Sequence, residues 1–400
     1  MPMTDLKAYG PAPVDPLAYG EGAPGWNGKR LVHFGLHNSA NRNAGDTLLF
    51  PVVRRTFDVA FGPFAWDLRQ LWQDFTPDAA REINGRFDGA VLGGGGLLLR
   101  DQAGAEASKS GWQWNSTPEA VAELHVPLSV FAIGYNRFRG QEDFDPVFTP
   151  HLRQTVRTAA FFGLRNHGSI AAVRDYLPDD LKDRPAHQYC PTTVLWQLYP
   201  EMRAAVEARG RPSRPVLAVN AAFDRAAMRF GDRQDEQLAS LARVMRKAQA
   251  RGWEIVQISH KTMDRGVEPA LDAAGVDYRT VDLSDAAADQ VMQFYSGVDL
   301  AVGMRGHAQM IPFGLRRPII SLISHNKMRY FLDDVGRNDW GLEVADPDFE
   351  ARLDAMIRQV EDDPDRIAVS LGSAQEGVWQ ATRANMARIG RDVLGLPLRI

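Results

Sequence analysis

Short apolar runs, each followed by a segment with helical spacing, recur along most of this 400-residue chain. They lie at 30–35, 87–92, 126–134 and 160–164, and again at 216–220, 254–259, 298–302 and 318–322, and a short, more polar strand is predicted at 277–281. Strands that alternate with helices imply βαβ units and parallel sheets. A Pro- and Arg-rich stretch at 204–215 separates the two series. We therefore predict an α/β fold in which two Rossmann-like domains face a cleft.

The expected organisation has five parts. These are an irregular leader rich in Pro and Gly at 1–28, an N-terminal Rossmann-like domain at 29–203, a linker at 204–215, a C-terminal Rossmann-like domain at 216–372 and a C-terminal helical segment at 373–400. The last segment carries an apolar stripe on a long helix, and we expect it to pack back on the N-terminal domain. Cys190 is the only cysteine, which excludes an intramolecular disulfide and leaves its role open.

Composition excludes several classes of protein. The formal net charge is −4, without a long run of one sign, which argues against a general nucleic-acid binder. No segment reaches the roughly twenty apolar residues that span a bilayer, so we expect no transmembrane segment. The N-terminus shows no signal-peptide pattern. We therefore expect a cytoplasmic protein, with peripheral attachment to the inner face of the membrane and the oligomeric state left open.

The most specific polar set lies between 303 and 331. Arg305 and His307 follow the apolar run at 298–302, and Lys327 follows the run at 318–322. Ligands of open α/β sheets bind at the carboxyl ends of neighbouring strands. One imidazole and two cations suit a small, multiply charged anion to which a proton must be moved. The alternative for His307 is a histidine that begins a helix and bonds to the backbone.

Two glycine-containing turns of the N-terminal half allow both a functional and a structural interpretation. Asn43-Ala44-Gly45-Asp46 follows the first apolar run and either faces a ligand or is an ordinary loop and helix cap. The run of glycines at 93–96, which includes Gly94 and Gly95, either cradles an anion with its backbone N–H groups or is a flexible turn.

Arg165 follows a further apolar run, with Ser169 in the next turn. It either clamps a carboxylate or phosphate or pairs with a surface aspartate. Trp112 and Trp114 lie in a polar stretch and are either core residues or a platform for a sugar ring. No metal site is visible, because the chain has one cysteine and no His-Glu-x-x-His motif.

In their order and spacing along the chain, these motifs resemble those of the polysaccharide pyruvyl transferase family. The resemblance runs from about residue 31 to 336 and includes Met304-Arg305-Gly306-His307, Gly314-x-x-x-Pro318, Lys327 and Phe331. It implies a fold like that of the two-domain GT-B glycosyltransferases. It also implies transfer of a pyruvyl group from phosphoenolpyruvate to sugar hydroxyls, forming a ketal, in the biosynthesis of an exopolysaccharide or related glycan. No cofactor is expected, since phosphoenolpyruvate is the donor substrate.

The resemblance also assigns roles to individual residues. His307 would be the general acid, and Asp46 matches the acidic turn of the family. In the mechanism that we expect, Asp46 would deprotonate the acceptor hydroxyl. The residues expected to bind substrate are Arg165, Arg305, Lys327, Asn43, Gly45, Gly94, Gly95 and Ser169. This chain departs from the family in carrying Cys190-Pro191 where Asp-Pro is usual, and Asn166 where Asp or Glu is common.

Two other functions stay open at this point. A GT-B-type glycosyltransferase would use the same cations for the diphosphate of a nucleotide sugar, and a non-catalytic relative would bind a sugar or an anion. The partners expected for the main hypothesis are phosphoenolpyruvate and a sugar or glycan acceptor, either free or lipid-linked. The acceptor sugar and its linkage depend on loops at 36–44 and 100–118, whose conformation the sequence does not reveal.

Overall fold

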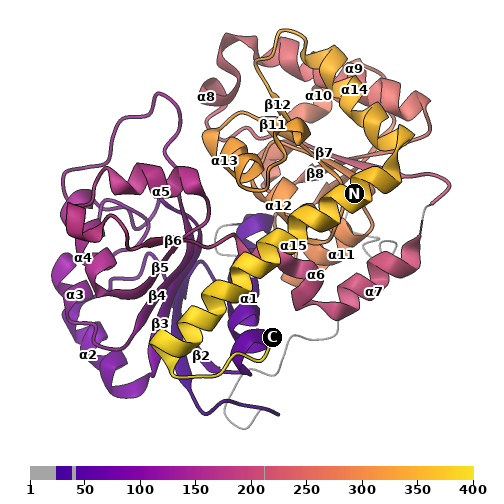
Figure 1. The fold of residues 1–400 in the computed structure, drawn as a ribbon. Coiled ribbons are helices and arrows are strands. Elements are labelled where there is room, and N and C mark those ends of the chain that lie inside the picture. The colour runs from indigo at the N-terminus through magenta and orange to yellow at the C-terminus, as the bar shows by residue number, and fades with distance from the viewer. Residues whose placement is uncertain (1–23, 38–41, 211) are drawn as a thin grey trace. The chain divides into compact units, whose positions relative to one another are not determined.

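A computed structural model describes residues 24–37, 42–210 and 212–400 (Figure 1). Most of the predicted leader and part of the 36–44 loop lie outside these residues. The described chain divides into two compact units. The N-terminal unit comprises 24–37, 49–191 and 379–400, and the C-terminal unit comprises 42–48, 192–210 and 212–378.

The N-terminal unit is built on a six-stranded parallel sheet with the order β2-β1-β3-β4-β5-β6. Its strands are β1 (Arg30–Gly35), β2 (Ala65–Gln70), β3 (Gly89–Leu98), β4 (Leu128–Tyr135), β5 (Ala159–Leu164) and β6 (Pro185–His187). Figure 1 shows α1 (Ala44–Phe61) on one face and α2 (Pro77–Arg86), α3 (Pro118–Ala122), α4 (Phe148–Thr158) and α5 (His167–Arg174) on the other. Right-handed crossovers require this distribution, because only the β1–α1–β2 connection runs toward the β2 edge.

The C-terminal unit repeats the design with the order β12-β11-β10-β7-β8-β9, again all parallel. Its strands are β7 (Val216–Asn220), β8 (Glu254–Ser259), β9 (Tyr278–Asp282), β10 (Leu300–Gly303), β11 (Ile319–Ile323) and β12 (Gly341–Glu343). Its helices are α6 (Leu195–Leu198), α7 (Pro200–Arg209), α8 (Ala226–Phe230), α9 (Gln234–Ala250), α10 (Glu268–Ala273), α11 (Ala288–Ser296), α12 (His307–Gly314), α13 (Asn326–Asp334), α14 (Phe349–Asp362) and most of α15 (Pro364–Ile389). The two parallel sheets confirm the predicted α/β class.

The last turns of α15 belong to the N-terminal unit. Asn385 Nδ2 donates to the carbonyl oxygen of His187 at 2.7 Å, and Thr382 Oγ1 accepts from Gln188 Nε2 at 3.4 Å. These bonds attach the C-terminal segment to the end of β6.

Three local predictions need correction. Part of the expected linker at 204–215 is helical, because α7 extends to Arg209. The glycine run does not end β3, which continues through it to Leu98. Gly93 and Gly95 adopt φ values of 114° and 97°, and the pairing with β4 shifts its register after Gly95, so this part of β3 is an irregular strand.

The third correction concerns Trp112 and Trp114, which are fully buried. Their rings pack edge-on against each other and against His151, and Trp112 Nε1 donates to His151 Nδ1 at 2.8 Å. Both tryptophans are core residues, so their interpretation as a sugar platform is wrong. The other ring nitrogen of His151 lies 2.8 Å from Ser116 Oγ, which suits a neutral imidazole that donates from Nε2.

The buried His151 predicts a loss of stability in acid. Burial lowers the pKa of His151 from 6.5 to about 3. Between these two pH values the ring is protonated in the unfolded chain but neutral in the folded protein. Stability therefore falls as the pH falls. Between about pH 7 and pH 5 the wild type should lose about 2 kcal/mol more than a His151→Gln variant, which has no titrating ring. Urea unfolding at the two pH values measures this difference.

The comparison with the variant matters because Asp58 acts in the opposite direction. Burial raises the pKa of Asp58 from 3.8 to about 7, so its protonation stabilises the folded state in mild acid. This contribution is common to both proteins and cancels in the difference. Equal pH slopes for the wild type and His151→Gln would contradict the prediction.

Candidate active site

The carboxyl ends of β10 and β11 and the start of α1 carry six of the ten predicted site residues, all in the C-terminal unit. Arg305 and His307 follow β10, and Lys327 follows β11; these strands pair in parallel with Val302 beside Ile320. The prediction that two neighbouring strands carry these residues is therefore confirmed. A Cβ added to Gly306 would lie 3.8 Å from Lys327 Cε, so the lysine side chain reaches the turn between Arg305 and His307.

The first turn of α1 lies directly against His307. A Cβ on Gly45 would stand 2.2 Å from His307 Nδ1, so only a glycine allows this approach. The backbone N–H of Ala44 donates to the carbonyl oxygen of His260 at 3.0 Å, which attaches the start of α1 to the end of β8. The turn predicted from Asn43 to Asp46 is thus in contact with the predicted general acid.

Asn43 organises this turn. Its Oδ1 accepts from Gly45 N at 3.2 Å, and its Nδ2 donates to Asp46 Oδ2 at 2.8 Å. The side chain therefore caps the start of α1 and holds the carboxylate of Asp46 in one orientation. Asn43, Gly45, Asp46 and His307 form one cluster.

Arg305 is engaged by two carboxylates that the sequence analysis missed. Its Nε donates to Asp264 Oδ2 at 2.6 Å and its Nη2 donates to the other oxygen, which makes a bidentate pair. Its Nη1 lies 2.8 Å from Asp224 Oδ1. Burial tends to lower the pKa of Arg305, but the carboxylates of Asp264 and Asp224 outweigh it and raise this pKa. Arg305 is therefore a firmly held cation whose charge is largely balanced.

Asp264 holds Arg305 in place and has further hydrogen-bond partners on neighbouring strand ends. It is fully buried and also accepts from Asn220 Nδ2 and from the backbone N–H of His260, each at 3.0 Å. It therefore joins the ends of β7, β8 and β10.

His260, directly after β8, is a neutral imidazole. Its pKa lies well below 6.5 because the ring is buried and lies near Arg305 and His307. Its Nε2 lies 2.6 Å from the Tyr295 hydroxyl oxygen.

Arg165 forms a separate cluster in the N-terminal unit. It follows β5, is buried, and its side chain crosses Gly134, where a Cβ would stand 2.2 Å from Arg165 Nε. A Cβ on Gly96 would lie 3.2 Å from Arg165 Nη2. Gly94 and Gly95 are buried instead, and a Cβ on either would contact the Leu49 methyl groups at 3.4 and 3.2 Å. Gly96 is therefore the member of the glycine run beside Arg165.

Ser169 and Asn166 serve the backbone near Arg165. The buried Ser169 Oγ accepts from Tyr135 N at 3.0 Å and so ties the end of β4 to α5. Asn166 is the N-cap of α5, with its Oδ1 accepting from Ser169 N at 2.7 Å. A helix cap is a role that aspartate and asparagine fill about equally, which explains how Asn166 can stand where an acidic residue is common.

Two buried histidines, His33 and His37, lie near the glycine run, and His33 contacts it directly. His33 Nε2 bonds the carbonyl oxygen of Gly93, and Arg54 Nη1 lies 3.3 Å from His33 Nδ1 and 3.4 Å from His37 Nδ1. Burial, with a contribution from Arg54, lowers the pKa of His37 to about 4 and that of His33 well below 6.5. Both rings are therefore neutral and accept from the guanidinium. His33 is 60 residues away from Gly93 in the sequence, so no local sequence pattern indicates that it supports the glycine run.

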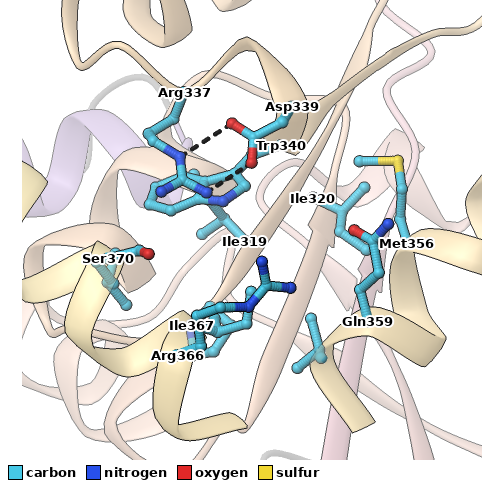
Figure 2. A pocket seen from close by; sticks show the side chains of 13 residues that line it. Ile319, Ile320, Arg337, Asp339, Trp340, Met356, Gln359, Arg366, Ile367 and Ser370 are labelled. Carbon is cyan, nitrogen blue, oxygen red and sulfur yellow. Dashed lines mark hydrogen bonds and ion pairs between the residues drawn. The ribbon is translucent and has the colours of Figure 1, made fainter. Parts of the chain in front are cut away.

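A cavity of about 250 Å³ lies elsewhere in the C-terminal unit (Figure 2). It is at the amino end of β11, whereas Lys327 follows the carboxyl end of the same strand. Within it, Arg337 lies 4.2 Å above the Trp340 ring and forms a bidentate pair with Asp339. Among the described residues that line this cavity there is no predicted site residue, so we place the candidate active site at the carboxyl edge.

The family model for polysaccharide pyruvyl transferases matches residues 43–326. The chain belongs to the polysaccharide pyruvyl transferase family. The match covers more than two thirds of the chain and includes the Asn43–Asp46 turn, Arg165, Arg305 and His307. It ends one residue before Lys327 and is narrower than the resemblance traced in the sequence. This membership establishes the chain as a transferase of the pyruvyl transferase type. No curated protein matches it.

Solved structures relate this pyruvyl transferase to GT-B proteins. A UDP-GlcNAc 2-epimerase from Neisseria meningitidis gives a TM-score of 0.53 at 9% identity, over 90% of this chain and 100% of that one. A putative UDP-N-acetylglucosamine 2-epimerase from Listeria monocytogenes gives 0.56 at 10% identity, over 90% and 96%. The MnaA–UDP structure from S. aureus gives 0.51 at 11% identity, over 92% and 98%. At these identities the likeness shows the fold alone, which is GT-B-like as predicted.

Across the described part of this pyruvyl transferase, no helix combines the length and apolar character needed to cross a membrane.

Proposed function

We propose that this transferase moves the pyruvyl group of phosphoenolpyruvate to hydroxyls of a sugar in a polysaccharide or glycan precursor, forming a ketal. The observation that carries the proposal is the contact between His307 and the first turn of α1, where Gly45 makes room for the imidazole. This contact puts a proton donor next to the turn that holds Asp46. The reaction needs both groups, since one proton must reach the donor and others must leave the acceptor.

The charges of the donor suit the cations of the two clusters. Phosphoenolpyruvate carries a carboxylate and a phosphate, and we assign Lys327 and Arg165 as their main partners. Arg305 contributes N–H groups at a fixed position rather than net charge, because Asp264 and Asp224 balance it. Gly94, Gly95 and Ser169 contribute to the cluster around Arg165 indirectly, since the two glycines lie in the irregular part of β3 and Ser169 ties the end of β4 to α5.

The proposed reaction begins with transfer of a proton from His307 to the methylene carbon of the donor. The central carbon becomes electrophilic, and a sugar hydroxyl attacks it while Asp46 accepts the hydroxyl proton. The bond between this carbon and the phosphate oxygen then breaks, and phosphate leaves. A second sugar hydroxyl closes the ketal and loses its proton to Asp46 or to the departing phosphate. Two carbon–oxygen bonds form and one breaks, and the methylene becomes a methyl group.

A panel of free and lipid-linked sugar acceptors, each incubated with phosphoenolpyruvate, tests the proposal. The expected result is phosphate release that depends on an acceptor, with a product heavier by one pyruvyl group in mass spectrometry. Stabilisation of the protein by a nucleotide sugar but not by phosphoenolpyruvate would support a glycosyltransferase instead. Because phosphoenolpyruvate is a cytoplasmic metabolite, we propose that the reaction takes place in the cytoplasm, and a lipid-linked product would place it at the membrane.

Gly134 provides a test of the role of Arg165. In Gly134→Ala the new methyl group would displace the guanidinium of Arg165, since it would stand 2.2 Å from Nε. The KM for phosphoenolpyruvate should rise by roughly tenfold or more through a lost charge-assisted hydrogen bond, with a smaller change in kcat. Steady-state kinetics at varied donor concentration measure both constants.

Gly85→Ala is the matched control for this variant. Gly85 lies in α2, and a Cβ there would have no heavy atom within 4 Å. Its kinetic constants should equal those of the wild type. An unchanged donor KM in Gly134→Ala, in a folded protein, would remove Arg165 from the donor site.

A further inference from the structure

Asp224 lies among the cations of the candidate active site and is the accessible one of the two carboxylates on Arg305. Its Oδ1 is 2.8 Å from Arg305 Nη1, and its Oδ2 accepts from Arg229 Nη2 at 2.9 Å. The Asp224 side chain is 24% exposed, whereas that of Asp264 is fully buried. An anion that enters from solvent can therefore meet Asp224 but not Asp264.

Arg229 keeps Asp224 in this position. Its Nε donates to the Asp224 carbonyl oxygen at 2.8 Å, so it binds both the backbone and the side chain of this residue. Its Nη1 donates to Ser324 Oγ at 2.9 Å, in the connection that leads to Lys327. The buried arginine thus joins the loop after β7 to the loop after β11 and holds the carboxylate of Asp224 toward Arg305.

The electrostatics make Asp224 a permanent negative charge at this place. Burial tends to raise the pKa of Asp224, but Arg305, Arg229 and Lys327 outweigh it and hold this pKa well below its usual value. Asp224 and an incoming anion would share the same cations. Like charges a few ångströms apart in a partly buried site repel each other appreciably, so the carboxylate opposes the binding of a second anion.

We propose that Asp224 limits the affinity of the site for phosphate-bearing anions and thereby speeds the release of phosphate. In the empty site it pairs with Arg305. When a phosphate-bearing anion is bound, Asp224 remains beside it as a destabilising charge, and this repulsion is relieved when the phosphate leaves. The effect on affinity requires only that anions bind here; the effect on turnover rests on the proposed function.

Binding of inorganic phosphate to Asp224→Asn tests the effect on affinity. The substitution keeps the size and one acceptor oxygen but removes the charge. Isothermal titration calorimetry should show phosphate binding about tenfold tighter than in the wild type. Lys327→Met should bind phosphate more weakly than the wild type. Unchanged or weaker binding in Asp224→Asn would overturn the inference, and weaker binding would make Asp224 a support for Arg305.

The matched control is Asp339→Asn, which removes the carboxylate from another arginine pair of the same unit. Asp339 lies at the amino edge of the sheet, so phosphate binding should stay at the wild-type level. If Asp224→Asn fails to fold, as judged by thermal unfolding, Asp224→Ser replaces it and should show the same increase in affinity. Tighter phosphate binding in Asp339→Asn as well would contradict a specific role for Asp224.

Turnover experiments separate this inference from the proposed function. With phosphoenolpyruvate and an acceptor, Asp224→Asn should form one equivalent of ketal in a burst and then turn over more slowly than the wild type. If the wild type transfers pyruvyl but the variant gains no phosphate affinity, the inference fails and the proposed function stands. If the variant gains phosphate affinity but the wild type transfers no pyruvyl, the proposed function fails. Absence of phosphate binding in both proteins would overturn the inference.

Discussion

His307→Ala should turn over phosphoenolpyruvate about 10²–10⁴ times more slowly than the wild type, while it folds normally. The imidazole is partly exposed at the start of α12, so its removal leaves no buried cavity. What is lost is the proton donor to the methylene carbon. The effect should therefore fall on kcat, with little change in the affinity for phosphate, because Lys327 and Arg165 remain.

Isotope incorporation makes this prediction specific to proton transfer. In deuterated water the wild type should place one deuterium in the new methyl group during each turnover, and His307→Ala should do so only at its residual rate. His125→Ala is the matched control, since His125 is an exposed histidine of the N-terminal unit. Near-normal turnover of His307→Ala would remove this residue from the role of general acid.

Gly45→Ala should have an effect almost as large, although it leaves every chemical group in place. The added methyl group would stand 2.2 Å from His307 Nδ1 and 2.8 Å from His307 Cβ, so the imidazole and the first turn of α1 cannot both keep their positions. A displacement of about 1 Å at a reacting group can lower the rate roughly 10²-fold. Rate measurements on the purified variant, together with its melting temperature, provide the test.

Gly85→Ala again provides the comparison, because Gly85 also lies within a helix but has open space around it. Alanine in a helix is more favourable than glycine by roughly 0.5–1 kcal/mol, so this control should be as active as the wild type and slightly more stable. Wild-type activity in Gly45→Ala would show that the contact between α1 and His307 has no catalytic importance.

The sequence predicted the strands well because their apolar runs report local burial. The rule that ligands bind at carboxyl ends of parallel strands then located Arg305, His307 and Lys327 at one edge. The same rule, applied to the runs at 216–220 and 254–259, would have indicated Asp224 and Asp264. Single acidic residues in loops are usually solvated, so their sequence context does not distinguish these two, and only the three-dimensional structure shows them on a largely buried guanidinium.

The glycine run and the tryptophans show what local sequence cannot supply. Glycines are typical of turns, but here the backbone of Gly93 and Gly95 pairs with β4, and the His33 side chain bonds the carbonyl oxygen of Gly93. Trp112 lies in a polar stretch, but its partner His151 is 39 residues away. In each case a contact between distant parts of the chain determines the structure, and no pattern within a short window reports it.

The start of α1 belongs to the C-terminal unit, and this division of the chain has a consequence for protein engineering. An exchange of the N-terminal unit between family members would place junctions at the boundaries near residues 191 and 378. Residues 42–48, however, are part of the C-terminal unit, and Gly45 is matched in shape to His307. A functional chimera must therefore keep this short segment and residues 192–378 from one parent, so the exchange needs an additional pair of junctions around the start of α1.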